Sequence, residues 1–250
     1  MICYVDLEHE KVSQDTQRKA NWLARRADVQ YKLEEISGDA CLLQRYSNVT
    51  RQKLKEWRIR ALILSGCATD WIEYRPGCFD ELFEIIRAAE LPILGFCGGH
   101  QLIAMAHGAP VGPMRRLNSD KKDPAPHFAT GWWKESGFTP VHLLQDDPLF
   151  AGLSNPAIFL ESHYWEIKEP PAGFEVLAST DACRVQAMKR RDKLVYGTQF
   201  HPEEYSEKPY GIRSIAVHAI YPGGYPEERS DGRTLIANFF RLAGFAGRAG

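Results

Sequence analysis

The chain has 250 residues, of which 44% are hydrophobic and 25% are charged, and its formal net charge is −1. This balance is typical of a globular protein with a large core, and it excludes an intrinsically disordered chain. The isoelectric point near 6.7 indicates no overall field that would attract nucleic acid or a membrane surface, so neither partner is expected.

The cysteines lie far apart in the sequence and form no CxxC pair, at Cys3, Cys41, Cys67, Cys78, Cys97 and Cys183. This spacing argues against a structural zinc site and against a disulfide framework, so we expect no metal and no cofactor. The N-terminal residues 1–11 carry acids where a signal peptide would be basic and then apolar. No stretch approaches the ~18 apolar residues of a membrane span, and the sequence therefore predicts a reducing, cytoplasmic location.

The first 107 residues alternate between apolar runs and segments of helical periodicity. Strands are predicted at residues 2–6, 40–45, 61–64 and 92–96, and helices at 13–36, 52–57, 78–90 and 99–107. Because the strands are almost entirely apolar, they are expected to form a parallel sheet covered on both faces. The fold class predicted is α/β, a flavodoxin-like three-layer sandwich with a mostly parallel central sheet.

The remaining sequence predicts mainly strands and one closing helix at 232–242. The strand-like runs lie at 141–144, 158–160, 175–178, 185–188 and 194–200. They predict an added antiparallel β layer within a single domain spanning residues 1–250. Residues 206–230 are too apolar for a free linker and too rich in Pro and Gly for a long helix. We interpret them as an insertion that forms a lid or docks a partner protein, the alternative being a surface excursion without a functional role.

A nucleophile elbow is predicted where the strand at 92–96 meets the next helix. Gly95-Phe96-Cys97-Gly98-Gly99 has the G-x-nucleophile-x-G form, with cysteine as the nucleophile. The glycines leave room for a sharp turn, and the N-terminal end of the helix favours a thiolate at Cys97. The Gly98 N–H is placed to stabilise a developing oxyanion. We therefore predict that Cys97 is a catalytic nucleophile.

A base for this nucleophile is predicted at the end of the strand at 194–200. His201 follows that strand, where open α/β sheets place their ligands. Glu203 lies two residues further on and can accept a hydrogen bond from the imidazole, which fixes its tautomer. His163 is an alternative base, because Glu161 and Glu166 lie close to it in the sequence.

Two segments resemble the signatures of class I glutamine amidotransferases. They are LGFCGGHQLIAMAHGAPV at residues 94–111 and YGTQFHPEE at residues 196–204. The resemblance extends from about residue 2 to residue 204 and resumes in the last helix, and it is closest to stand-alone glutaminases and to the glutaminase domain of GMP synthetases. It implies a Cys-His-Glu triad at Cys97, His201 and Glu203, a γ-glutamyl thioester and the release of ammonia.

The same resemblance implies roles for residues around the nucleophile. Gln101 would frame the glutamine pocket, and His163 and Tyr164 would lie at the amino-acid end of the substrate. The second N–H of the oxyanion hole would come from Cys67. Here the sequence departs from the family, because it has Leu-Ser-Gly-Cys-Ala-Thr at 64–69 where LSGGPxS is usual. If the backbone at Cys67 needs a positive φ, a cysteine there costs about 1 kcal/mol. The departure leaves three alternatives open: an oxyanion hole built differently, a hole that forms only in an activated state, or a pocket reshaped for another γ-glutamyl substrate.

Three functions remain open from the sequence. The first is a glutaminase that supplies ammonia to a synthetase on another chain. The second is a freestanding hydrolase of γ-glutamyl amides or peptides, which would need a more open pocket. The third is a non-catalytic regulatory protein on the same fold, against which the intact Cys97, His201 and Glu203 set argues.

Overall fold

The computed structural model describes residues 1–118, 123, 129–205 and 230–246. The strands of these segments form a nine-stranded sheet in the order β2-β1-β3-β4-β11-β10-β9-β6-β7 and a two-stranded sheet of β5 and β8. The predicted insertion at 206–230 lies outside the described residues except for Ser230, whose side chain caps the last helix.

Five of the nine strands of the large sheet run parallel to one another, as their continuous apolar sequences predict. It consists of β2 (Cys41–Arg45), β1 (Ile2–Asp6), β3 (Ala61–Leu64), β4 (Ile93–Phe96) and β11 (Val195–Thr198). Because parallel strands end at the same edge, the residues that follow β1, β3, β4 and β11 come together there. This edge carries the candidate site.

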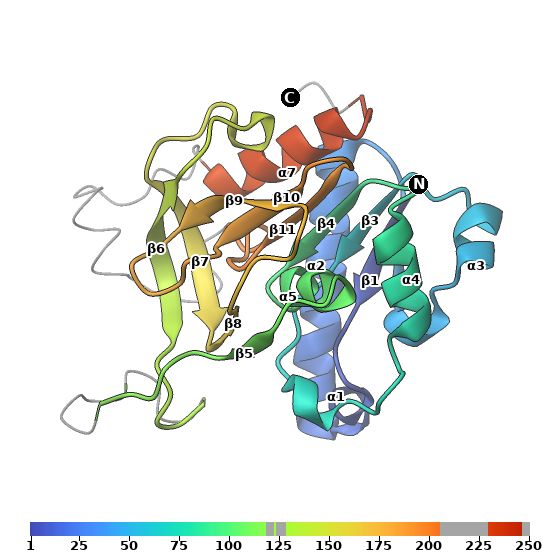
Figure 1. Ribbon diagram of the computed structural model, residues 1–250. Helices are drawn as coiled ribbons and strands as arrows, with labels where there is room; N and C mark the ends of the chain where they lie inside the picture. The colour runs from blue at the N-terminus through green and yellow to red at the C-terminus, as the bar shows by residue number, and fades with distance from the viewer. Residues whose placement is uncertain (119–122, 124–128, 206–229, 247–250) are drawn as a thin grey trace.

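The antiparallel strands continue the same sheet beyond β11 (Figure 1). They are β10 (Ala187–Arg190), β9 (Phe174–Ser179), β6 (Glu135–Leu143) and β7 (Ala157–His163), while β5 (Val111–Pro113) pairs with β8 (Trp165–Ile167). The predicted fold class is therefore confirmed. β5 and β8 were not predicted, because three residues are too few to show a periodicity.

Helices cover both faces of the sheet and bury two separate apolar clusters. On one face, α2 (Thr16–Ser37) and α7 (Asp231–Leu242) pack on side chains such as Tyr4 of β1. On the other face, α3 (Arg51–Glu56), α4 (Asp80–Ala88) and α5 (Gly98–Ala106) pack on side chains such as Val5. Neighbouring residues of one strand face opposite layers, as the pleat requires.

The helix predicted at 13–36 is in fact two helices, α1 (Glu10–Gln14) and α2. Asp15 separates them because its backbone is extended, with φ −80° and ψ 111°. Its carboxylate accepts hydrogen bonds from the N–H groups of Gln17 and Arg18, which is the usual cap of a helix N-terminus. Short 3₁₀ turns complete the connections, at Tyr46–Asn48, Trp71–Glu73 and Pro148–Phe150.

Candidate active site

Cys97 lies on a sharp turn between β4 and α5, with φ 46° and ψ −99°. This conformation is unfavourable for a residue with a side chain, and it places the thiol above the edge of the sheet. A Cβ on Gly95 would lie 2.5 Å from the carbonyl carbon of Gly99, and a Cβ on Gly99 would collide with the Leu64 carbonyl oxygen. The turn therefore requires both glycines.

His201 lies beside Cys97 because the strands that precede them are neighbours. β4 and β11 pair in parallel, and the Cys97 N–H donates to the Thr198 carbonyl at 2.7 Å. The Nδ1 atom of His201 lies 2.8 Å from Oε1 of Glu203. Burial disfavours the imidazolium, but Glu203 and Cys97 outweigh burial and raise the pKa of His201 well above its usual value. The structure thus brings together the three residues predicted as a triad.

Cys67 and Gly98, predicted to form the oxyanion hole, lie against each other. A Cβ built on Gly98 would lie 2.9 Å from the Cys67 nitrogen. The backbone at Cys67 does not have a positive φ, so the strain considered from the sequence does not arise there. Within the described part of the chain, the Cys67 N–H donates no hydrogen bond and remains available to a ligand. Gly66 lies against the imidazole of His201, since a Cβ built on Gly66 would lie 2.9 Å from Cε1 of His201.

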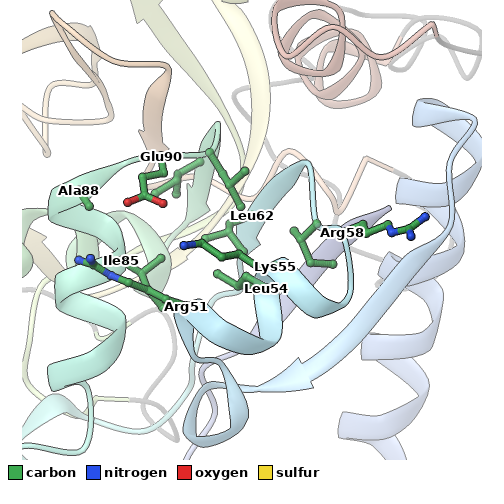
Figure 2. A pocket seen from close by; sticks show the side chains of 11 residues that line it. Arg51, Leu54, Lys55, Arg58, Leu62, Ile85, Ala88 and Glu90 are labelled. Carbon is green, nitrogen blue, oxygen red and sulfur yellow. The ribbon is translucent and has the colours of Figure 1, made fainter.

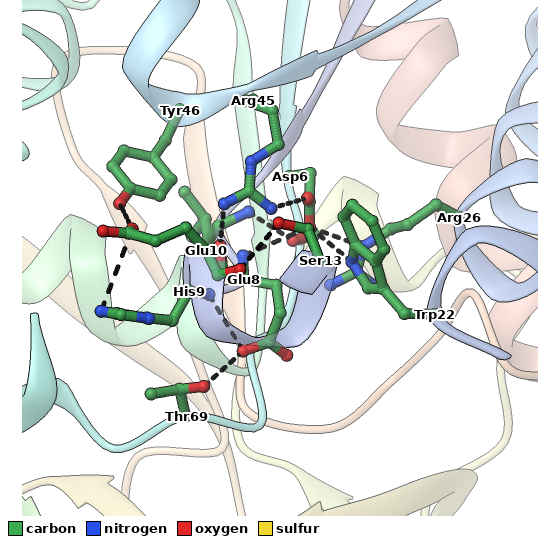
Figure 3. Close-up of polar contacts among 12 residues, drawn as sticks. Asp6, Glu8, His9, Glu10, Ser13, Trp22, Arg26, Arg45, Tyr46 and Thr69 are labelled. Atoms are coloured by element: carbon green, nitrogen blue, oxygen red, sulfur yellow. Dashed lines mark hydrogen bonds and ion pairs between the residues drawn. The ribbon is translucent and has the colours of Figure 1, made fainter. Parts of the chain in front are cut away.

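The loop that carries Cys67 is held by a buried glutamate that the sequence did not suggest (Figure 3). Glu8, which is 4% exposed, follows β1 and accepts hydrogen bonds from the Ala68 N–H at 2.8 Å and from the Thr69 hydroxyl at 2.7 Å. Hydrogen bonds from a loop N–H to a buried carboxylate are strong and directional. Glu8 is therefore placed to fix the Cys67 backbone.

An arginine network supports the same loop through Arg26 of α2, which is joined by way of Asp6 to Arg45 of β2. Arg26 donates to the Gly66 carbonyl at 2.8 Å. Arg26 also donates to Asp6 at 2.7 Å, and Arg45 donates to the other Asp6 oxygen at 2.7 Å (Figure 3). Asp6 is only 1% exposed, so its charge needs these partners. The only signal of this network in the sequence is an acidic residue at the end of an apolar strand.

Two glutamine side chains form a separate hydrogen-bond network, and one of them reaches the sulfur of Cys97. Gln199 donates from Nε2 to the Cys97 sulfur at 3.5 Å, and its Oε1 accepts from Gln101 at 3.0 Å. Gln101 also donates to the Trp165 carbonyl at 2.9 Å and accepts from Trp71 at 2.7 Å. The Gln101 side chain is thus engaged with the protein, consistent with a framing role. Gln199 is a residue that sequence reasoning missed.

His163 does not contact Cys97 in this arrangement. Its Nδ1 lies 2.9 Å from the Trp165 carbonyl, and its Nε2 faces Glu135 at 3.0 Å and Glu161 at 3.3 Å. Burial would lower the pKa of His163, but the two carboxylates raise it to about 10. Because both ring nitrogens are engaged elsewhere, the geometry favours His201 over His163 as the base. Tyr164 points to Asp70, to which its hydroxyl donates.

A cavity of about 470 Å³ opens onto these residues. Cys97 and His201 lie in its wall with Gln101, His163 and Tyr164, and it extends to α2 at Asn21 and Arg25. This volume is in the range of small-molecule sites. The residues predicted to bind the substrate therefore share one cavity with the predicted nucleophile.

Another cavity, of about 260 Å³, lies between α3 and α4 (Figure 2). Its floor is aliphatic, with Leu54, Leu62 and Ile85, and its rim carries Arg51 and Lys55. Glu90 also lines it, but none of the described residues around it is a cysteine, serine or histidine, so we assign no chemistry to it. In the part of the chain that is described, no helix is both long and apolar enough to cross a membrane.

Comparisons with known proteins show the family of the chain. The glutamine amidotransferase class-I family matches residues 29–217. A subunit of glutamine-hydrolyzing GMP synthase from Methanocaldococcus jannaschii is 38% identical over 187 residues, 75% of this chain and 76% of that protein. The Pyrococcus abyssi protein of the same name is 33% identical over 152 residues, 61% of this chain and 70% of that protein.

A solved structure supports the fold. It is a Thermoplasma acidophilum protein provisionally named as a GMP synthase subunit, with a TM-score of 0.65, 24% identity and coverage of 98% of this chain and 94% of that chain. The chain therefore belongs to the class-I glutamine amidotransferase family and is an amide hydrolase that acts on carbon–nitrogen bonds.

Proposed function

We propose that the protein hydrolyses the side-chain amide of glutamine through a γ-glutamyl thioester on Cys97. The thiolate attacks the amide carbon, and the oxyanion accepts hydrogen bonds from the N–H groups of Gly98 and Cys67. His201, held by Glu203, protonates the leaving nitrogen, which departs as ammonia. His201 then deprotonates a water molecule, which hydrolyses the thioester to glutamate and restores the thiol.

The observation that carries this proposal is the position of Cys97 at a positive-φ turn beside the His201–Glu203 pair, within one cavity. A buried cysteine with only a structural role needs neither a strained backbone nor a paired histidine. The same arrangement argues against the non-catalytic alternative.

We further propose that the ammonia is delivered to a synthetase on a separate chain. The support is the similarity to proteins named as subunits of GMP synthase, which the chain matches over 76% and 70% of their lengths. Ammonia is readily lost to water as ammonium, so a glutaminase that supplies a synthetase benefits from direct contact with it. We therefore expect a partner to bind near the mouth of the Cys97 cavity and to raise its turnover.

The test is ammonia release from glutamine by the purified protein, alone and with candidate synthetase chains. We expect glutamine-dependent ammonia in the parent and none in Cys97→Ala, with unchanged circular dichroism in both. A glutamine-derived diazo-ketone should label Cys97, and Cys41→Ser provides the matched control because it removes a distant buried thiol. Labelling at Cys67 in place of Cys97 would contradict the assignment of the nucleophile.

A freestanding γ-glutamyl amide hydrolase is a second candidate, because the cavity continues from Cys97 along α2 to Asn21 and Arg25. This extension offers room for an amine larger than ammonia. Measuring kcat/KM for glutamine and for a series of γ-glutamyl amines separates the two functions. A glutaminase loses efficiency as the amine grows, whereas a γ-glutamyl amide hydrolase gains it.

A further inference from the structure

Four buried side chains converge at the wall of the cavity, two of them lining it and two behind it, and the proposed chemistry at Cys97 does not use them. They are Glu135 in β6, Glu161 and His163 in β7, and Cys183 in the turn before β10. The register of β6 and β7 pairs Glu135 directly with His163. Oxygen, nitrogen and sulfur atoms of Glu135, His163 and Cys183 all lie within 4.8 Å of one another. These are the donor atoms that zinc takes from proteins.

The hydrogen bonds of His163 determine which nitrogen faces the cluster. Nδ1 lies 2.9 Å from the Trp165 carbonyl, which can only accept, so Nδ1 carries a proton. Nε2 faces Oε2 of Glu135 at 3.0 Å and Oε2 of Glu161 at 3.3 Å. In a neutral imidazole, Nε2 presents a lone pair to two carboxylates. A positive charge, either a proton or a metal ion, must therefore lie between them.

A single proton on Nε2 of His163 cannot supply a hydrogen bond to both of the facing carboxylates, Glu135 and Glu161. Glu161 is only 1% exposed, and its oxygens have no hydrogen bond within the described segments beyond their ion-pair contact with His163. A proton on Nε2 points at one oxygen only, and Glu135 is the nearer. A divalent ion contacts both carboxylates at once. The separations of 3.0 and 3.3 Å are close to the roughly 3.3 Å between two ligands on a tetrahedral zinc ion.

Neighbouring groups already orient the ligand atoms. The Thr180 hydroxyl donates to Oε1 of Glu135 at 2.7 Å, and Gln186 donates to Oε2 at 2.7 Å. The Trp165 carbonyl orients His163. Outer contacts of this kind hold metal ligands in position and fix the histidine tautomer. Glu161 and His163 also line the Cys97 cavity, which gives an ion a route to the cluster.

We propose that Glu135, His163 and Cys183 bind one Zn²⁺ ion, with Glu161 as the fourth ligand. Binding displaces two protons to solvent, one from the Cys183 thiol and one from Nε2 of the His163 imidazolium, and leaves His163 neutral with its remaining proton on Nδ1. The ion joins β6, β7 and the turn before β10, and so stabilises the strand end that leads to Tyr164. The site stands independently of the amide hydrolysis proposed for Cys97.

The test uses the full chain carrying Cys97→Ala, so that zinc cannot bind to the thiolate beside His201. After treatment with a chelator and addition of ZnCl₂, gel filtration and metal analysis should give one zinc per chain. Isothermal titration should show affinity lowered at least about tenfold by Cys183→Ala and by Glu135→Gln, but not by the matched control Cys41→Ser. The Co²⁺ form should show thiolate-to-metal charge-transfer absorption that Cys183→Ala removes.

Two results would overturn the proposal. One is a folded Cys97→Ala protein that retains no zinc, or whose Co²⁺ form lacks thiolate absorption. This measurement needs no further substitution, so it decides the question even if Cys183→Ala fails to fold. The other is a zinc affinity of the Cys97→Ala protein that stays the same when Cys183→Ala or Glu135→Gln is added, which would place the ion elsewhere. In either case His163 is held as an imidazolium between two glutamates.

Discussion

Nδ1 of His201 lies 2.8 Å from Oε1 of Glu203, with a single proline between the two residues in the chain. The carboxylate is 5% exposed and the imidazole 12% exposed, so water screens their interaction weakly. Glu203, together with Cys97, holds the pKa of His201 well above its usual value. The imidazolium form is therefore expected to persist through neutral pH, ready to protonate the leaving nitrogen.

Glu203→Gln is expected to lower the pKa of His201, because it removes the negative charge that favours the imidazolium. The alkaline limb of kcat/KM should move to lower pH, and kcat should fall roughly 10²-fold. His201→Asn should lower kcat further than Glu203→Gln does, since proton transfer is lost altogether. The pH profile for glutamine hydrolysis measures both effects. An unshifted limb in Glu203→Gln, together with inactive Glu161→Gln, would indicate instead that His163 is the base.

Glu8→Ala is expected to disorganise the loop that carries Cys67. It leaves the Ala68 N–H and the Thr69 hydroxyl without their acceptor, at a cost of about 1–3 kcal/mol in the free energy of unfolding. The kcat for glutamine hydrolysis should also fall, because the Cys67 N–H would no longer be held in position for the oxyanion. Cys67→Ala keeps the backbone N–H and should retain activity within about threefold. Urea denaturation and glutaminase kinetics on both variants give the comparison, and equal activity of the two would contradict this role for Glu8.

Gly99→Ala is expected to destroy the turn at Cys97. The added methyl group would overlap the Leu64 carbonyl oxygen, and overpacking of this kind costs about 1–3 kcal/mol or displaces the backbone. Gly112→Ala is the matched control, because its Cβ would meet only the flexible end of Lys168 at 3.4 Å. The melting temperature and the rate of diazo-ketone labelling at Cys97 should both be lower in Gly99→Ala and unchanged in Gly112→Ala.

Gln199→Leu is expected to slow attack by Cys97 without unfolding the protein. It removes the amide donor that lies 3.5 Å from the sulfur, and a hydrogen bond to a charged group contributes about 1.5 kcal/mol, or roughly tenfold in rate. Alkylation of Cys97 by iodoacetamide at neutral pH should slow by a similar factor. Gln52→Leu, at an exposed position of α3, controls for the loss of an amide. Equal alkylation rates in both variants would leave Gln199 a packing residue only.

The sequence by itself determined the local features of this protein. Apolar runs and helical periodicity predicted the parallel strands and their helices. Burial of both faces requires a continuous apolar run, and burial of one face requires apolar residues at a regular spacing. The glycines around Cys97 predicted its turn, and the spacing of His201 and Glu203 predicted their pairing. The family signatures lie in the same short segments. The start of α2 was misplaced, because the capping role of Asp15 competes with a periodicity that continues through it.

Only the tertiary structure decided which distant side chains meet. Glu8 reaches Ala68 and Gln199 reaches Cys97 because the ends of β1, β3, β4 and β11 lie at one edge of the sheet. Arg26 reaches Gly66 because α2 packs on one face of the same sheet. The order of the strands and the pairing of Glu135 with His163 have no signature in any single segment. Such contacts arise from the packing of whole strands and helices, so their chemistry becomes visible only once the chain is folded.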